Sequence, residues 1–204
     1  MRYQRAVEKL RILAEACERV TFFWFDTEPF LKAVYAFGDV VDGADPLDDV
    51  QVAVAINLSP EEVPWESNPE GTDWLATELR LSKGGFMYLW RSHLDPVWNH
   101  YIRGPVRIWS VDGGPDEQAL AALEARDFGS LKRLIPESAD ERLQLREDLA
   151  AALAHLREVR DKYWEHDWRR EHRGNGRYPE NELWDAVEGY LDLLDASRSS
   201  APDA

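Results

Sequence analysis

The chain has 204 residues, of which 44% are hydrophobic and nine are tryptophan, so it can bury a core and is not expected to be disordered. Its formal net charge of −15 repels phosphate backbones, which makes nucleic acid an unexpected partner. The single cysteine, Cys17, excludes an intramolecular disulfide and a zinc site built from several thiolates. A charged N-terminal segment and the lack of an apolar run of about 20 residues predict a cytoplasmic protein without signal peptide or membrane span.

The first 114 residues alternate between helical and strand-like patterns. Apolar residues three or four apart predict an amphipathic helix over residues 2–20. The run VQVAVAINL (50–58) alternates large apolar residues with small ones, which is typical of a strand covered on both faces. Other elements are expected in the same region: a β-prone run at 21–25, strands at 34–39, 84–92 and 104–112, and a helix at 73–81.

The pattern changes after Gly113-Gly114-Pro115, because every later periodic segment is helical. Helices are predicted at 116–126, 139–172 and 181–196. We therefore predict an α+β protein with a mixed-sheet unit at 1–114, a helical C-terminal region at 115–197 and a flexible tail at 198–204.

The most informative stretch is VYAFGDVVDGADPLDDVQVAVAINL (34–58), in which a strand ends at Gly38-Asp39 and a loop leads to Asp49-Val50-Gln51. It resembles the polymerase-β-type nucleotidyltransferase motif, a Gly-Ser turn followed by Asp-x-Asp on the next strand. Two carboxylates at i and i+2 of a strand point to one face, where they can share divalent metals.

The resemblance implies a nucleotidyltransferase-like sheet in which Asp39 and Asp49 hold Mg²⁺ or Mn²⁺ and Gly38 and Gln51 lie beside a bound phosphate. Asp112 is the candidate for the third catalytic carboxylate. Two departures weaken this set: Asp39 stands where the motif has Ser, and Gln51 stands where it has the second Asp. A neutral amide offers a metal one carbonyl oxygen and no charge.

Three functions remain open from these residues. The first is a catalytically degenerate nucleotidyltransferase that binds a nucleotide or a small anionic ligand. The second is a non-catalytic module whose acidic face contacts a basic protein partner, since eleven acidic residues and no Lys or Arg lie between Lys32 and Arg80. The third is an active, metal-dependent transferase that uses Asp39 or Asp112. A solvated turn explains the aspartates without any ligand.

Two further clusters contain candidate ligand-binding residues. Residues 88–109 are rich in Trp, Tyr, His and Arg, a composition suited to stacking a base and holding a phosphate. The alternative is that the aromatic residues form core and the Arg residues pair with the acidic loop. The candidates in this segment are Arg91, His93, His100, Arg103 and Arg107.

The second cluster spans residues 160–184, where Arg170 and Arg173 precede a Gly174-Asn175-Gly176 turn that can bind an anion. Arg160 and His166 have the Arg-x5-His spacing of HEPN ribonucleases. The resemblance to that family rests on this spacing alone, which also arises by chance in helices that contain Arg and His. The alternative is an ion-paired helix end packed by tryptophans.

Two longer segments, WRSHLDPVWNHYIRGPVRIWS (90–110) and YPENELWDAVEGYLDLLDA (178–196), resemble a bacterial domain family without an assigned activity. This resemblance implies that one family extends over the whole chain, and it adds no function.

Overall fold

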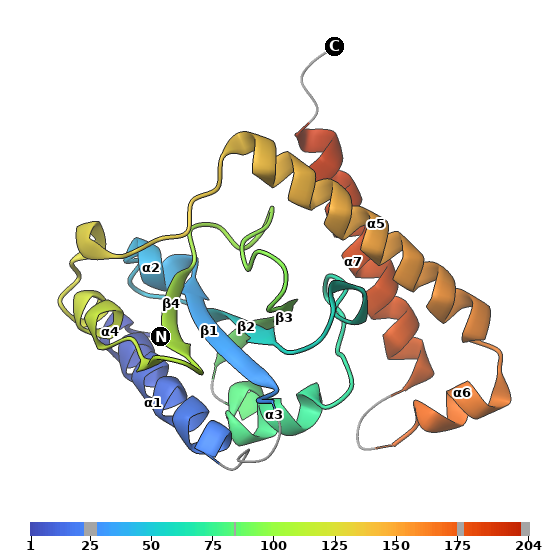
Figure 1. Cartoon of the computed structure of the whole chain (residues 1–204), viewed down its shortest axis with the longest axis horizontal. Coiled ribbons are helices and arrows are strands. Elements are labelled where there is room, and N and C mark those ends of the chain that lie inside the picture. The colour runs from blue at the N-terminus through green and yellow to red at the C-terminus, as the bar shows by residue number, and fades with distance from the viewer. Residues whose placement is uncertain (23–27, 84, 175–177, 201–204) are drawn as a thin grey trace.

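The computed structural model describes residues 1–22, 28–83, 85–174 and 178–200. It confirms the predicted α+β fold with a mixed sheet, to which helices are added on both faces (Figure 1). The helices are α1 (Tyr3–Phe22), α2 (Asp39–Asp42), α3 (Thr72–Glu78), α4 (Glu117–Glu124), α5 (Ser138–Lys162), α6 (His166–Glu171) and α7 (Pro179–Ser199). The strands are β1 (Leu31–Phe37), β2 (Val50–Ile56), β3 (Phe86–Ser92), β4 (Val106–Ser110) and β5 (Gly114–Pro115).

The sheet has the order β3-β2-β1-β4-β5. β1 is antiparallel to both β2 and β4, whereas β2 and β3 are parallel. A parallel pair needs a crossover connection, and residues 57–85 with α3 provide it. β3 therefore forms one edge of the sheet, next to the strand that carries Gln51.

One face of the sheet packs against α1 and α4. Val50, Val52, Val54 and Ile56 of β2 are fully buried in this core, together with the apolar side of α1. At about 25 cal/mol per Å² of apolar area, such burial is the main force that holds α1 on the sheet. The predicted alternation of β2 is confirmed, because Ala53 and Ala55 on the opposite face are also buried.

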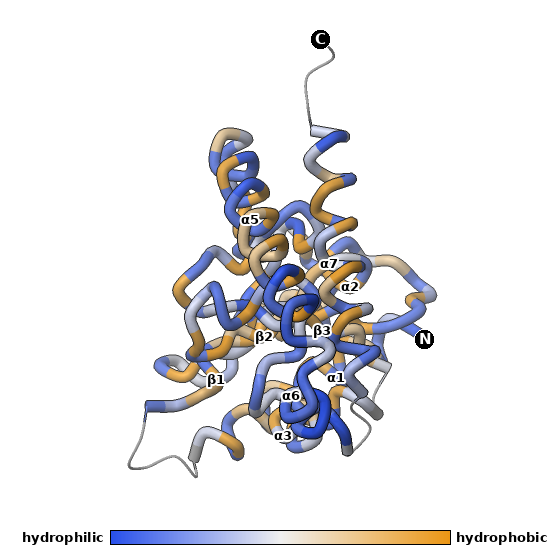
Figure 2. Tube along the Cα trace, turned by 90° about the vertical axis from the view of Figure 1, so that its right-hand side faces the viewer, coloured by the Kyte–Doolittle hydropathy of each residue, from blue (hydrophilic) through white to orange (hydrophobic). Residues whose placement is uncertain are grey.

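The other face is covered by α5 and α7, which lie side by side (Figure 1). A second core joins Phe37 and Ala53 of the sheet to Leu145 of α5, Leu193 of α7 and Ile102 of the loop between β3 and β4. Hydrophobic and hydrophilic residues alternate along α5 and α7, whereas α6 is mostly hydrophilic (Figure 2). The small side chains on this face of β2 leave room for the loop to enter between sheet and helices.

Several element boundaries differ from the sequence prediction. The strand expected at 34–39 is β1 at Leu31–Phe37, and Asp39 begins α2. The β-prone run at 21–25 begins inside α1, where the Thr21 hydroxyl donates to the Cys17 carbonyl over 2.5 Å; residues 23–25 lie outside the described part of the chain. The helix expected at 139–172 is broken between Lys162 and His166 into α5 and α6. α7 continues to Ser199, so the expected tail begins later, and residues 201–204 are not described.

The division of the chain at residue 114 stays a prediction. α4, which follows that position, packs against α1 and β4. None of the helices in the described ranges is both long and apolar enough to cross a bilayer.

Gly189 of α7 provides a direct test of how α7 is seated. A Cβ at this buried position would overlap the backbone carbonyl oxygen of Trp65. Replacing a helical Gly by Ala contributes roughly 1 kcal/mol of stability, but overpacking against backbone costs about 1–3 kcal/mol. We expect Gly189→Ala to destabilise the protein by about 1 kcal/mol in urea unfolding, which is the overpacking cost less the gain in helix propensity.

The matched control is Asp195→Ala, an exposed position on the same helix, which should change the unfolding free energy by less than about 0.5 kcal/mol. A Gly189→Ala protein as stable as wild type would contradict the close approach of α7 to Trp65.

Candidate functional site

The turn after β1 holds the residues that resemble the nucleotidyltransferase motif. Gly38 has a φ of 63°, and α2 begins at Asp39. The Asp39 backbone N–H donates to Gln51 Oε1 over 3.2 Å, and a Cβ at position 38 would overlap this amide. The position therefore requires glycine. Gln51 fills the space directly over the turn, which is where the resemblance places a phosphate.

The three predicted carboxylates do not share one site. Phe37 pairs with Gln51, which puts Asp39 and Asp49 at the same end of the β1–β2 pair. Ser110 pairs with Ala33, so Asp112 follows β4 at the opposite end of β1, roughly 20 Å away at 3.3 Å per residue.

The neighbouring strand supplies no replacement for this third acid, because the β3 residue opposite Gln51 is Met87. In the described ranges, no group of three or more His, Cys, Asp or Glu side chains could hold a metal ion. Gln51, whose Oε1 already accepts a backbone N–H, does not replace the missing charge. The residues present do not fit the two-metal arrangement that the resemblance implies.

Tyr101 lies beside this turn and was not predicted from the sequence. Its ring meets those of Phe37 and Trp65 at centroid distances of 6.1 and 6.0 Å. Burial raises the pKa of the Tyr101 hydroxyl, and the negative charge of Asp49 raises it further. The tyrosine therefore stays protonated beside the acidic turn at neutral pH.

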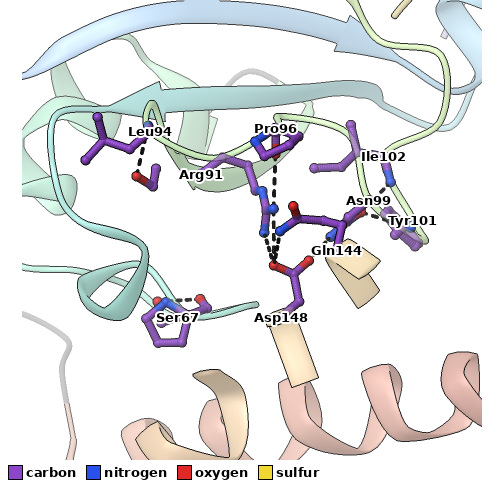
Figure 3. Close-up of polar contacts among 11 residues, drawn as sticks. Ser67, Arg91, Leu94, Pro96, Asn99, Tyr101, Ile102, Gln144 and Asp148 are labelled. Atoms are coloured by element: carbon purple, nitrogen blue, oxygen red, sulfur yellow. Dashed lines mark hydrogen bonds and ion pairs between the residues drawn. The ribbon is translucent and has the colours of Figure 1, made fainter. Parts of the chain in front are cut away.

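Arg91 has a structural contact instead of a ligand (Figure 3). Its side chain is 2% exposed and forms an ion pair with Asp148 of α5 at 3.3 Å, while Nη2 also donates to the Pro96 carbonyl over 3.1 Å. Gln144 donates to the same carboxylate over 3.0 Å, and the Asn99 amide reaches its other oxygen at 3.5 Å. This network joins β3, the loop after it and α5.

The position of Arg91 also separates it from the acidic turn. It pairs with Ala55, six residues along β2 from Asp49, which corresponds to roughly 20 Å. The expectation that Arg91 pairs with the acidic loop is wrong, because its guanidinium pairs with Asp148. The expectation that Arg91 binds a phosphate stays a prediction. A signal for this contact was present: Gln144 and Asp148 are polar residues at i and i+4 on the buried stripe of α5.

The two histidines of the same segment do not meet. Residues 93–105 form a loop, in which the His93 backbone N–H bonds to the end of β2 and burial lowers the pKa of its ring. His100 Nε2 lies 2.8 Å from Asp192 of α7, which also accepts from the Trp65 indole over 2.7 Å. The Arg103 Nε–H donates to the His100 carbonyl over 3.0 Å. The sequence analysis did not predict a role for Asp192, because its partners Trp65 and His100 lie 127 and 92 positions away and no local pattern reports such contacts.

Two of the five aspartates of the acidic loop pair with arginines from a later segment. Arg126 pairs with Asp45 at 2.6 Å, and Arg133 pairs with Asp42 at 2.7 Å and also donates to the Val41 carbonyl. Arginines do pair with this loop, as one alternative predicted. They are Arg126 and Arg133, whereas the sequence predicted arginines of the segment 88–109.

The C-terminal candidates lie away from both regions. Arg170 is exposed near Asp167 at 3.5 Å, and Arg173 follows the end of α6. Arg160 belongs to α5 and bonds to its neighbour Asp161, whereas His166 begins α6, so the HEPN-like spacing does not lie on one continuous helix. The Gly174-Asn175-Gly176 turn falls mainly on residues outside the described ranges, and anion binding there stays a prediction.

Arg107 lines a cavity of about 220 Å³ at the β4 side of the sheet. The cavity also receives Lys132 and Tyr35, and neither cation has an ion pair within the residues that the structure describes. Burial raises the pKa of the Tyr35 hydroxyl, while the adjacent Arg107 guanidinium opposes that rise. Asp116 contributes the one carboxylate of the lining, and its Oδ1 accepts the Ala119 N–H as the N-cap of α4. The other lining residues are Val106, Gln118, Ala119, Ser130 and Leu134.

A family described as a domain of unknown function (DUF7711) matches residues 1–199. The chain belongs to this family. The whole-chain resemblance seen in residues 90–110 and 178–196 is thereby confirmed. Among solved structures, the DUF7711 chain is similar to that of a "putative nucleotidyltransferase from Sulfolobus solfataricus", with 17% sequence identity and a TM-score of 0.39. That match covers 55% of this chain and 90% of the other. No curated protein matches the chain.

The buried ion pair of the DUF7711 protein leads to a stability prediction. Removing one partner leaves the other charge buried and alone, so Asp148→Ala and Arg91→Met should each cost about 3–5 kcal/mol. The double variant Arg91→Met, Asp148→Leu leaves no unpaired charge and should cost much less than the sum of the two single changes. Urea unfolding of all four proteins measures these terms.

Additive losses in the double variant would contradict the pairing. Intact stability of Asp148→Ala would show that Arg91 is free to serve a ligand.

Proposed function

We propose that this DUF7711 protein is a catalytically degenerate, nucleotidyltransferase-like protein that binds a small anion between β1, β4 and the start of α4. The observation that carries the proposal is the cavity that Arg107, Lys132 and Tyr35 line, in which neither cation has an ion pair in the described chain. The net charge of −15 gives the protein a negative potential that repels anions on average. Two cations without ion pairs at one cavity attract an anion locally.

The loss of catalysis is supported by the acidic turn. Transfer of a nucleotidyl group requires divalent metals to bridge the triphosphate and the attacking hydroxyl. Among the described residues, Asp39 and Asp49 do not belong to a group of three or more such side chains that could hold a metal ion, and the Gln51 amide accepts the backbone N–H at the turn that would approach a phosphate. Both departures from the motif, Asp39 in place of Ser and Gln51 in place of Asp, therefore weaken the binding of a metal–triphosphate complex.

The size of the cavity favours a small ligand. Its volume of about 220 Å³ is below the roughly 300–1,000 Å³ that is usual for drug-sized ligands. A guanidinium can donate two parallel hydrogen bonds to phosphate or carboxylate, and an ammonium adds a point charge. Asp116 opposes an anion, but one of its oxygens is already held by the helix N-terminus. Inorganic phosphate or the phosphate of a small ester suits this lining better than a whole nucleotide.

The experiment is calorimetric titration of the protein with inorganic phosphate and, separately, with the dicarboxylate succinate. We expect saturable phosphate binding that does not require Mg²⁺. Hydrogen bonds to charged groups contribute about 1.5–3 kcal/mol, so Arg107→Gln and Lys132→Gln should each weaken binding by about tenfold or more.

The control is Arg146→Gln on α5, an exposed arginine that bonds only to its own helix in the described chain. It should leave the phosphate affinity within about twofold of wild type. The proposal fails if phosphate does not saturate the protein, or if Arg146→Gln reduces binding as much as Arg107→Gln does.

A further inference from the structure

β3 presents a sheet edge that no other strand of the described chain covers. It is the terminal strand of the sheet and pairs only with β2. Among the described residues, no backbone hydrogen bond joins the outer side of β3 to another segment. Trp90, Arg91 and Ser92 are buried, so the part of this edge that an additional strand can pair with is Phe86–Leu89, whose residues are partly exposed.

A groove of about 430 Å³ runs along this edge, between Tyr88 and Trp90 of β3 and Trp184 of α7. Trp184 is 63% exposed, which is unusual for so large an apolar side chain. Trp90 is 5% exposed, and its indole Nε1 has no hydrogen-bond partner. A buried donor without an acceptor is costly to the fold, and Trp90 contributes such a donor to the wall of the groove.

The charge of the groove identifies the chemistry of its partner. Glu66, Asp185 and Glu188 line it, and the lining contains neither Lys nor Arg. Burial raises the pKa of Glu66, and the nearby carboxylates of Asp192, Glu188 and Asp185 raise it further. These acids repel one another, and no ion pair joins them to a Lys or Arg of the described residues, in contrast to Asp42 and Asp45 of the acidic loop, which pair with arginines. Exposed indole rings also attract Lys and Arg through their faces.

We propose that this groove binds an extended, Lys- or Arg-rich segment of a partner protein, which adds to β3 as a further strand. Backbone pairing along β3 gives affinity, and alternate basic side chains reach the carboxylates and Trp184. A second copy of this chain is a poor occupant, because its net charge is also −15. The surface is separate from the anion cavity, which lies on the β4 side of the sheet.

The test uses a fluorescein-labelled peptide of alternating Lys and Val residues and measures its fluorescence anisotropy with the full chain. A second peptide replaces every Val by Pro, which keeps the charge but removes every second backbone donor and fixes φ at those positions to about −65°. We expect the Lys-Val peptide to bind saturably and the Lys-Pro peptide about tenfold more weakly. Trp184→Ala and Glu188→Lys should each weaken binding of the Lys-Val peptide by about tenfold.

Two variants control for exposed aromatic area and for charge. Trp164→Ala removes a tryptophan that is 82% exposed and outside the groove, and Asp161→Lys makes the same charge change as Glu188→Lys on α5. Both should bind the Lys-Val peptide within about twofold of wild type. Since all four substituted side chains are exposed, circular dichroism should show unchanged folding.

Three results would overturn the proposal. Equal binding of the Lys-Pro peptide would mean charge attraction without strand pairing. Equal effects of the groove and control variants would place the peptide elsewhere. A dimer of the chain in solution that Trp184→Ala disrupts would make a second copy the occupant. None of these results depends on whether phosphate binds at Arg107.

Discussion

The buried ion pair between Arg91 and Asp148 is the contact on which the second half of the structure depends. α5 has few buried apolar side chains for its length, so hydrophobic burial alone holds it weakly to the sheet. The carboxylate of Asp148 instead collects Arg91, Gln144 and Asn99, and thereby fixes α5 and the loop after β3 together. α7 packs on α5, so the position of the groove between β3 and α7 follows from this pair. Removing a charge from water requires this full set of partners.

The cations of the described chain are unevenly distributed. Arg91 is used in the core, and Arg126 and Arg133 pair with Asp45 and Asp42 of the acidic loop. Arg107 and Lys132 line one small cavity, while the acids that line the groove beside β3 have no ion pair with a Lys or Arg of the described residues. Two surfaces of opposite charge are thus left open on opposite edges of one sheet. This arrangement accounts for both proposals without metal chemistry at Asp39 and Asp49.

Local patterns predicted the elements well, and long-range contacts could not be predicted. The alternation in 50–58 reported a strand buried on both faces, because the period of a strand is encoded in neighbouring residues. The order and direction of the strands are not encoded in neighbouring residues. Asp112 was therefore expected beside Asp49, but it lies at the other end of β1. The partner of Arg91 is 57 positions away. The break between α5 and α6 was missed because helical periodicity continues across it.

The most direct test of the central claim is a crystal structure of the protein soaked with MnCl₂ and a nucleoside triphosphate, then with phosphate. Manganese gives an anomalous signal that locates it independently of the refined atoms. The account predicts phosphate between Arg107 and Lys132 in the second soak, and no manganese or triphosphate at Asp39 and Asp49 in the first. A manganese peak between these aspartates, with triphosphate density over Gly38 and a displaced Gln51 amide, would contradict it.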